Sequence, residues 1–229
     1  MPALPAIDEV VLTRPEGSNA SLQAALEAAR PAGVDGRRPT WTALPLLAVR
    51  PLPDGGELPQ ALAEMGPEDL VVFVSPRAVA AAAGVRALAD WPIRHVAAVG
   101  ESTGQALTGE GRPDALVPAG SEDSEGLLDR LDDLAMAGRR VWIIRGEDGR
   151  ELLAEALAAR GARPRFVAVY QRTCAGLPPR LPAGPERLWI VTAPQALDCL
   201  AGLGAPNQGE SRGLLDLSLI HISEPTRPY

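Results

Sequence analysis

The chain has 229 residues, enough for one large domain or for two domains of roughly 100 residues each. All 22 basic residues are arginines and the net charge is −7, which excludes lysine-based chemistry and leaves no basic stripe for nucleic acid. Neither a signal peptide nor an apolar run of about 18 residues is present, which predicts a cytoplasmic protein.

Short apolar runs alternate with Ala- and Leu-rich stretches of helical period, a pattern typical of α/β folds with parallel sheets. The expected strands are residues 9–14, 46–50, 70–75, 95–100, 140–145, 166–170 and 188–192. The expected helices are residues 19–30, 76–88, 103–109, 124–135, 149–160 and 194–203. Because aromatic residues make up only 3% of the chain, we expect a core of Ala, Val and Leu.

Three segments recur in the same order along the chain, which predicts two similar α/β domains. Residues 11–14 (VLTR) match 142–145 (WIIR), residues 46–49 (LLAV) match 166–169 (FVAV), and residues 72–79 (VFVSPRAV) match 190–197 (IVTAPQAL). The repeat leaves open whether residues 70–75 or 188–192 form the third strand of the first domain.

Small or polar residues follow most of the expected strands and open the next helix. Candidate binding groups at these turns are Ser75, Gly100, Ser124 and Thr192. Free amides and the helix dipole favour anions at such strand ends, so an acidic ligand is one interpretation. Ordinary helix capping without a ligand is the other.

Four further residues have both a functional and a structural interpretation. Thr103 either caps its helix or offers its hydroxyl to a ligand, and Tyr170 is either a plug at a strand end or a proton donor. Arg14 and Arg145 occupy matching positions in the repeat. The guanidinium of each either binds a carboxylate of a ligand or forms a structural ion pair.

Cysteine and histidine are too sparse to predict a metal centre. Cys174 and Cys199 are far apart in sequence and form no CxxC motif, so we expect neither a metal site nor a disulfide framework. The two histidines, His95 and His221, have no third ligand near them. The prediction is therefore a protein without a metal.

From its start to about residue 204, the order of these segments resembles the uroporphyrinogen-III synthase family. The motifs that carry the resemblance are residues 11–15 (VLTRP), 73–79 (FVSPRAV), 99–103 (VGEST), 124–128 (SEGLL) and 169–172 (VYQR). Each motif is short, and their common order makes the resemblance specific.

The resemblance implies two flavodoxin-like parallel-sheet domains joined by a two-stranded connector. Domain 1 would be discontinuous and comprise residues 1–38 and 173–206, while domain 2 would comprise residues 39–172. The connector strands would lie near residues 41–50 and 166–172. Residues 188–192 would then lie beside 9–14, and residues 70–75 would belong to domain 2.

The resemblance also implies an activity in haem biosynthesis, the closure of hydroxymethylbilane to uroporphyrinogen III without a cofactor. Ring A of this linear tetrapyrrole loses its hydroxyl as water, and ring D attacks through a spiro intermediate and is inverted. Tyr170 would assist departure of the hydroxyl. The substrate-binding residues would be Arg14, Ser75, Gly100, Thr103, Ser124, Arg145 and Thr192. A monomer with transient contact to the preceding enzyme of the pathway is implied.

Two features depart from the family pattern. Ala193-Pro194 replaces the family's second Ser-Pro, with Thr192 as the substitute hydroxyl. Residues 207–229 lack the family's second Val-Gly turn and its helix, and residues 217–229 look like translated adaptor DNA. We therefore expect an aberrant tail outside the fold and an incomplete first domain with exposed apolar surface. A non-catalytic two-domain binder of a small anionic ligand is the alternative function.

Overall fold

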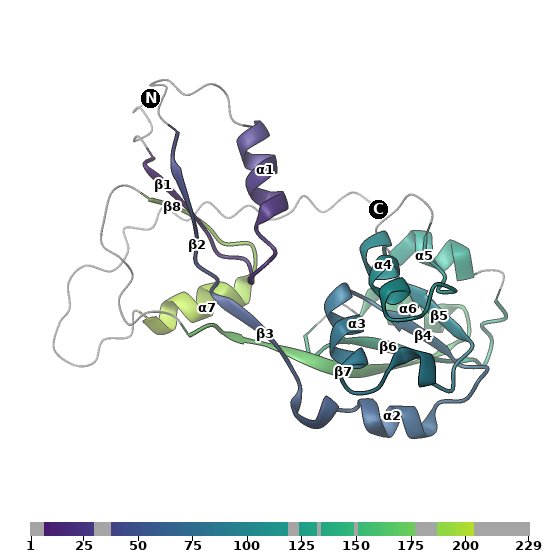
Figure 1. Ribbon diagram of the computed structural model, residues 1–229. Helices are drawn as coiled ribbons and strands as arrows, with labels where there is room; N and C mark the ends of the chain where they lie inside the picture. The colour runs from purple at the N-terminus through teal and green to yellow at the C-terminus, as the bar shows by residue number, and fades with distance from the viewer. Residues whose placement is uncertain are drawn as a thin grey trace. The chain divides into compact units, whose positions relative to one another are not determined.

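The computed structural model describes residues 7–29, 38–118, 124–131, 134–148, 151–176 and 187–203. The expected tail at 207–229 lies outside the described residues. The chain divides into two compact units, which Figure 1 shows as ribbons. Unit 1 contains Met1–Val49 and Thr173–Tyr229, and unit 2 contains Arg50–Arg172.

Unit 1 contains a three-stranded parallel sheet. Its central strand β1 (Glu9–Leu12) pairs with β2 (Thr40–Ala43) on one side and with β8 (Arg187–Ile190) on the other. This pairing confirms the expected position of residues 188–192 beside 9–14. Helices α1 (Ala20–Ala29) and α7 (Pro194–Leu203) complete the described part of the unit.

The core of unit 1 includes a small apolar cluster, formed by Leu46, Leu47, Ala196, Cys199 and Leu200. Three of these residues lie on α7 at a helical spacing of three to four positions, so they share one face of the helix. That face packs against the start of β3 (Leu47–Pro51).

A five-stranded sheet forms the centre of unit 2. Its strand order is β3, β7 (Arg163–Cys174), β6 (Arg140–Gly146), β4 (Leu70–Phe73) and β5 (His95–Ala98). The pairs β7/β6, β6/β4 and β4/β5 are parallel. All four residues of β4 are buried, as expected for a parallel strand covered on both faces.

Helices lie on both sides of this sheet (Figure 1). In chain order they are the 3-10 turn η1 (Pro53–Gly55), α2 (Leu58–Glu64), α3 (Pro76–Ala83), η2 (Leu88–Asp90), α4 (Glu101–Gly109), α5 (Ser124–Leu131) and α6 (Leu152–Ala159). Leu127 and Leu131 of α5 and Leu157 of α6 are fully buried against Leu70 and Val141. This aliphatic cluster is the core that the composition predicts.

The structure differs from the expected elements in a few places. Helix α2 was not expected, and α3 ends at Ala83 instead of residue 88 because Gly84 follows as its cap. Strand β7 spans twelve residues, far more than residues 166–170. Its exposed N-terminal half, with Arg163 and Arg165, lacks the apolar run that reveals a buried strand.

Candidate functional site

The carboxyl ends of the parallel strands of unit 2 meet at one edge of the sheet. Strands β4, β5 and β6 end at Phe73, Ala98 and Gly146, and Tyr170 of β7 pairs with Gly146. The turns that follow carry Ser75 and Gly100, so most of the expected site residues of this unit gather at this edge. Ligands bind at this edge in open α/β sheets.

Ser75 is the N-cap of α3. Its backbone is extended, and its hydroxyl accepts a hydrogen bond of 3.2 Å from the amide of Ala78. Pro76 occupies the first turn, where it costs no hydrogen bond because that position has no intrahelical acceptor. The capping interpretation therefore holds for Ser75, while its hydroxyl hydrogen can still be donated to a ligand.

The start of α4 has no side-chain cap, because the N-cap residue is Gly100. The amides of Thr103 and Gly104 bond to the carbonyl of Gly100, whereas the first amides of a helix have no intrahelical acceptor. The side chain of Thr103 is 2% exposed, and its hydroxyl makes no hydrogen bond to the described residues. This turn therefore offers neutral donors to an anion.

Tyr170 is buried at 6% exposure, beside the last residue of β6. Its carbonyl accepts a 3.0 Å hydrogen bond from the amide of Glu147, which fixes the backbone. Its phenol hydroxyl makes no hydrogen bond to the part of the chain that the structure describes. A phenol held in this way can donate a proton to a bound molecule.

Arg145 is buried beneath this edge, with its guanidinium 4.3 Å from the centre of the Phe166 ring. Its Nε and one terminal nitrogen donate to the carbonyls of Gly146 (3.1 Å) and Glu147 (3.3 Å). These contacts hold the turn that leaves β6.

Ser124 is the first residue of α5, in the same unit. Leu116, which precedes α5, forms an isolated parallel bridge with Ala97 of β5, so the chain approaches α5 from the side of the sheet that carries Ser75 and Gly100.

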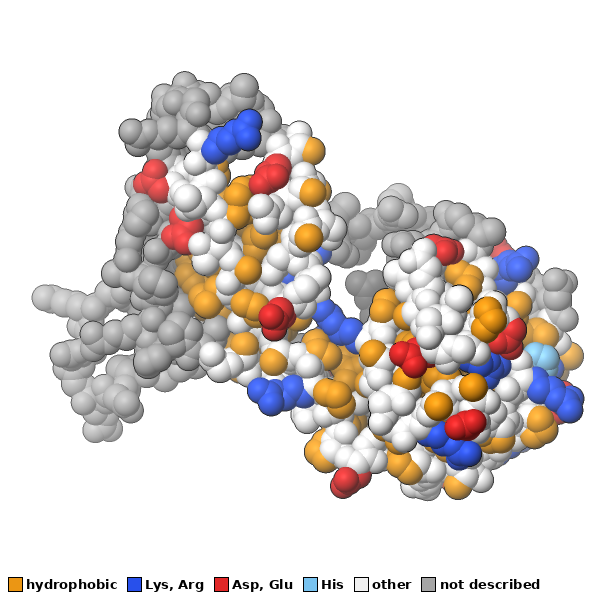
Figure 2. Space-filling model, in the orientation of Figure 1, with side chains coloured by type: hydrophobic (Ala, Val, Ile, Leu, Met, Phe, Trp, Pro, Cys, Tyr) orange, Lys and Arg blue, Asp and Glu red, His pale blue; other side chains and the backbone are white. Residues whose placement is uncertain are grey.

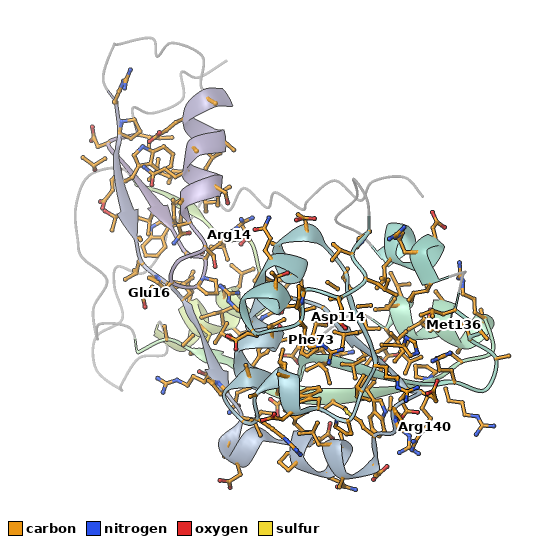
Figure 3. The ribbon with its side chains drawn as sticks, turned by 45° about the vertical axis from the view of Figure 1, so that its right-hand side comes forward. Arg14, Glu16, Phe73, Asp114, Met136 and Arg140 are labelled. Carbon is orange, nitrogen blue, oxygen red and sulfur yellow. A yellow bond between two sulfur atoms is a disulfide. The ribbon has the colours of Figure 1, made fainter. Side chains whose placement is uncertain are left out.

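Arg14 and Thr192 lie together in unit 1. The Nε of Arg14 donates to the hydroxyl of Thr192 at 3.3 Å, and Figure 3 labels Arg14 in the turn after β1. Sequence reasoning missed two supporting residues. The hydroxyl of Thr13 donates to the carbonyl of Ile190 at 2.7 Å, and Asn19 donates to the carbonyl of Arg14 at 3.3 Å. In the sequence, the available signal for Thr13 was its position directly before Arg14, at the end of an expected strand.

Cys174 and Cys199 form a disulfide, so the expectation of no disulfide was wrong. The two residues are 25 positions apart in sequence, but β7 and α7 bring their Cα atoms to 5.5 Å, a usual separation for a disulfide. The linear spacing did not reveal this proximity.

Among the described residues, no group of His, Cys, Asp or Glu could hold a metal ion.

A cavity of about 650 Å³ lies in unit 2 between the turn after β6 and the loop after β3. Glu57, Glu147 and Glu151 line it together with Arg145, so carboxylates outnumber the guanidinium. This lining disfavours a polyanionic ligand.

Acidic and basic side chains are also mixed over the visible face of unit 2 in Figure 2. No described helix is long and apolar enough to cross a membrane.

Comparison with known protein families gives one consistent match. The family model described as "Uroporphyrinogen-III synthase HemD" matches residues 39–228. The uroporphyrinogen-III synthase of Escherichia coli (strain K12) is 34% identical over 191 residues, which cover 79% of this chain and 76% of that protein. That of Salmonella typhimurium is 40% identical over 124 residues, 52% of this chain and 50% of that protein.

Solved structures with a similar fold carry the same description. The uroporphyrinogen III synthase of Thermus thermophilus has a TM-score of 0.51 and 20% identity, covering 74% of this chain. This chain spans 64% of that structure, less than two thirds of its length. The enzyme of Helicobacter pylori has a TM-score of 0.50 and 16% identity, covering 86% of this chain and 78% of its own. At these identities, the likeness shows an α/β fold alone.

Proposed function

Because the chain belongs to the uroporphyrinogen-III synthase family, we propose that it cyclises hydroxymethylbilane to uroporphyrinogen III with inversion of ring D and loss of water. The observation that carries this proposal is the sheet edge of unit 2. At this edge lies the buried phenol of Tyr170, whose hydroxyl has no hydrogen-bond partner among the described residues. The start of α4, which has no side-chain cap, lies at the same edge. The protein would thus be a lyase of haem biosynthesis.

We propose two flavodoxin-like domains whose first boundary differs from that of the compact units, since residues 39–49, with β2 paired to β1, belong to unit 1. Domain 1 comprises residues 1–38 and 173–206, and domain 2 comprises residues 39–172. The two-stranded connector near residues 41–50 and 166–172 is supported by β3 and β7, which are neighbours in one sheet and each run across a boundary between the units.

In the proposed reaction, the main task of the protein is to orient the substrate. Catalysis by protein side chains contributes less. Hydroxymethylbilane is reactive enough to cyclise unaided to the type I isomer, so the enzyme must fold it into the arrangement that inverts ring D. Orientation of this kind can supply roughly 7–11 kcal/mol. The hydroxyls of Ser75 and Thr103, the amides after Gly100 and the start of α5 at Ser124 would bind its carboxylates.

Tyr170 would act as the proton donor in this mechanism. Its phenol gives a proton to the hydroxyl leaving ring A, which departs as water, and the proton released on ring closure restores the phenol. Arg14 and Thr192 would bind substrate carboxylates from unit 1. Arg145, which already donates to Gly146 and Glu147, would add a positive charge beneath the turn.

No cofactor takes part in the proposed reaction, and the donors named above supply its binding and its proton. We further propose that the protein acts as a monomer in the cytoplasm. Hydroxymethylbilane is short-lived, so a transient contact with the enzyme that produces it would favour transfer before spontaneous closure.

A non-catalytic binder of an anionic ligand is the alternative, since neutral donors at a helix start serve both roles. The two are separated by adding the protein, well below the substrate concentration, to freshly generated hydroxymethylbilane and resolving the product isomers. A synthase yields many equivalents of type III product per chain. A binder yields the type I isomer at the spontaneous rate.

A further inference from the structure

Gly146 lies directly against the ring of Tyr170. A Cβ atom built on Gly146 would stand 2.5 Å from Cε2, 2.8 Å from Cζ and 3.0 Å from Cδ2 of that ring. All three distances are at or below the closest approach of packed carbon atoms. The phenol therefore occupies the space that any side chain at position 146 would need.

Position 146 needs a glycine because the ring of Tyr170 leaves no room for a side chain there. The backbone conformation at this position does not itself require a glycine. Gly146 is absent from the described glycines with positive φ, so an alanine could adopt its backbone without strain. A register shift makes the two residues neighbours. Arg145 pairs with Ala168, whereas Gly146 pairs with Tyr170, so β7 has one extra residue, Val169, at this point. Such irregularities redirect side chains near functional sites.

The backbone around Tyr170 is held on both sides of β7. The amide of Glu147 donates to the carbonyl of Tyr170, and the amide of Leu52 donates to the carbonyl of Val169, both at 3.0 Å. A side chain at position 146 would therefore displace the ring more readily than the strand. The hydroxyl, at the far end of the ring, would move furthest.

We infer that Gly146 is a positioning residue of the cyclisation, because it leaves the space that sets where the Tyr170 hydroxyl meets the substrate. This inference rests on the proposed function. It assigns to Gly146 no contact with the substrate and no part in the chemistry except through the phenol.

The test compares Gly146→Ala in two backgrounds, the parent chain and Tyr170→Phe. In the parent, Gly146→Ala should lower kcat for type III product at least tenfold while KM changes less than threefold. In the Tyr170→Phe background the ring still meets the new methyl group, but no hydroxyl is left to misplace, so Gly146→Ala should change kcat less than twofold. Thermal unfolding should shift equally in both backgrounds.

Equal losses of kcat in the two backgrounds would overturn the inference, because they would make the glycine's role structural. So would a Gly146→Ala chain that folds in neither background, or a Tyr170→Phe chain as active as the parent. Each of these outcomes leaves the proposed function itself untouched, provided that the parent chain forms type III product.

A readout independent of activity is the NMR signal of ¹³C-labelled tyrosine. The chain has two tyrosines, and the signal missing in Tyr170→Phe identifies residue 170. Gly146→Ala should shift that signal and leave the Tyr229 signal in place. An unmoved Tyr170 signal would overturn the inference. A parent that forms no type III product would refute the proposed function instead, and the tyrosine signal would still decide how Gly146 places the ring.

Discussion

Tyr170 and Tyr229 are the chain's two tyrosines, which allows a matched pair of substitutions. Tyr170→Phe keeps the buried ring and removes only the hydroxyl, so we expect kcat for type III formation to fall roughly 100-fold or more, as for loss of a general acid. KM should change little, since Phe preserves the packing. Tyr229→Phe is the control and should keep the parent rate. A Tyr170→Phe protein with the parent rate would remove Tyr170 from the mechanism.

Asp114, labelled in Figure 3, forms a two-pronged ion pair with the buried Arg112, with both N···O distances at 3.1 Å. The hydrogen bond from Arg112 lowers the pKa of this carboxyl below its usual value. A carboxyl with a lowered folded-state pKa stabilises the fold above its unfolded-state pKa, and this stabilisation is lost as the pH falls through the folded-state pKa.

Asp114→Asn should therefore lower the free energy of unfolding at pH 7 by no more than about 1 kcal/mol, because water screens the largely exposed carboxylate. Denaturant titrations of both proteins should converge as the pH falls through the folded-state pKa of Asp114, where the parent carboxyl is also protonated. A difference that persists undiminished in acid would show that the charge is not its source.

Among the elements, strands β4 and β6 are joined at their N-terminal ends by Asp69. Its carboxylate, which is largely buried, accepts from the indole of Trp142 (3.0 Å), from Nε of Arg140 (3.1 Å) and from the amide of Gly66 (3.0 Å). Figure 3 labels Arg140. These contacts lie at the strand ends opposite the proposed site, so their role is structural.

Asp69→Ala should lower the free energy of unfolding by about 2–3 kcal/mol, because the buried indole of Trp142 loses its acceptor and Arg140 its partner. Asp69→Asn keeps an acceptor oxygen and should cost less. Chemical denaturation followed by Trp fluorescence measures both changes. At a temperature where all three proteins are folded, the proportion of type III product should not differ among them.

The disulfide of Cys174 and Cys199 joins the end of β7 to α7 within unit 1. For a loop of this size, the chain-entropy model assigns about 3.5 kcal/mol to the bridge. We expect a thiol assay of the unreduced, denatured protein to find no free thiol, and the double substitution of both cysteines by serine to lower Tm. Two free thiols that persist after exposure to a mild oxidant would contradict the bridge.

At the scale of the whole molecule, the apolar runs were enough to predict most of the sheet strands, because parallel strands covered by helices are apolar on both faces. The run in β4 is an example, with four consecutive buried residues. The edge strand β2 has only one partly buried residue, Trp41, and so lacks that signal. The proximity of Cys174 and Cys199 depends on how β7 and α7 pack, which linear spacing does not encode.

The candidate site was predicted in part for the same reason. Strand ends were visible in the sequence, so Ser75, Gly100 and Tyr170 could be expected at one edge of a sheet. The pairing of Gly146 with Tyr170 could not be predicted, because one extra residue in β7 sets it and the run Phe166–Tyr170 shows no break in its apolar pattern. The contacts of Arg145 with its own turn likewise needed coordinates.

We propose that this chain directs hydroxymethylbilane to the type III isomer. The most direct measurement is the ratio of type III to type I uroporphyrinogen formed from freshly generated bilane, as a function of protein concentration. The claim predicts that the type III fraction rises towards completion at protein concentrations far below that of the substrate. A product that remains the type I isomer at every protein concentration would contradict it.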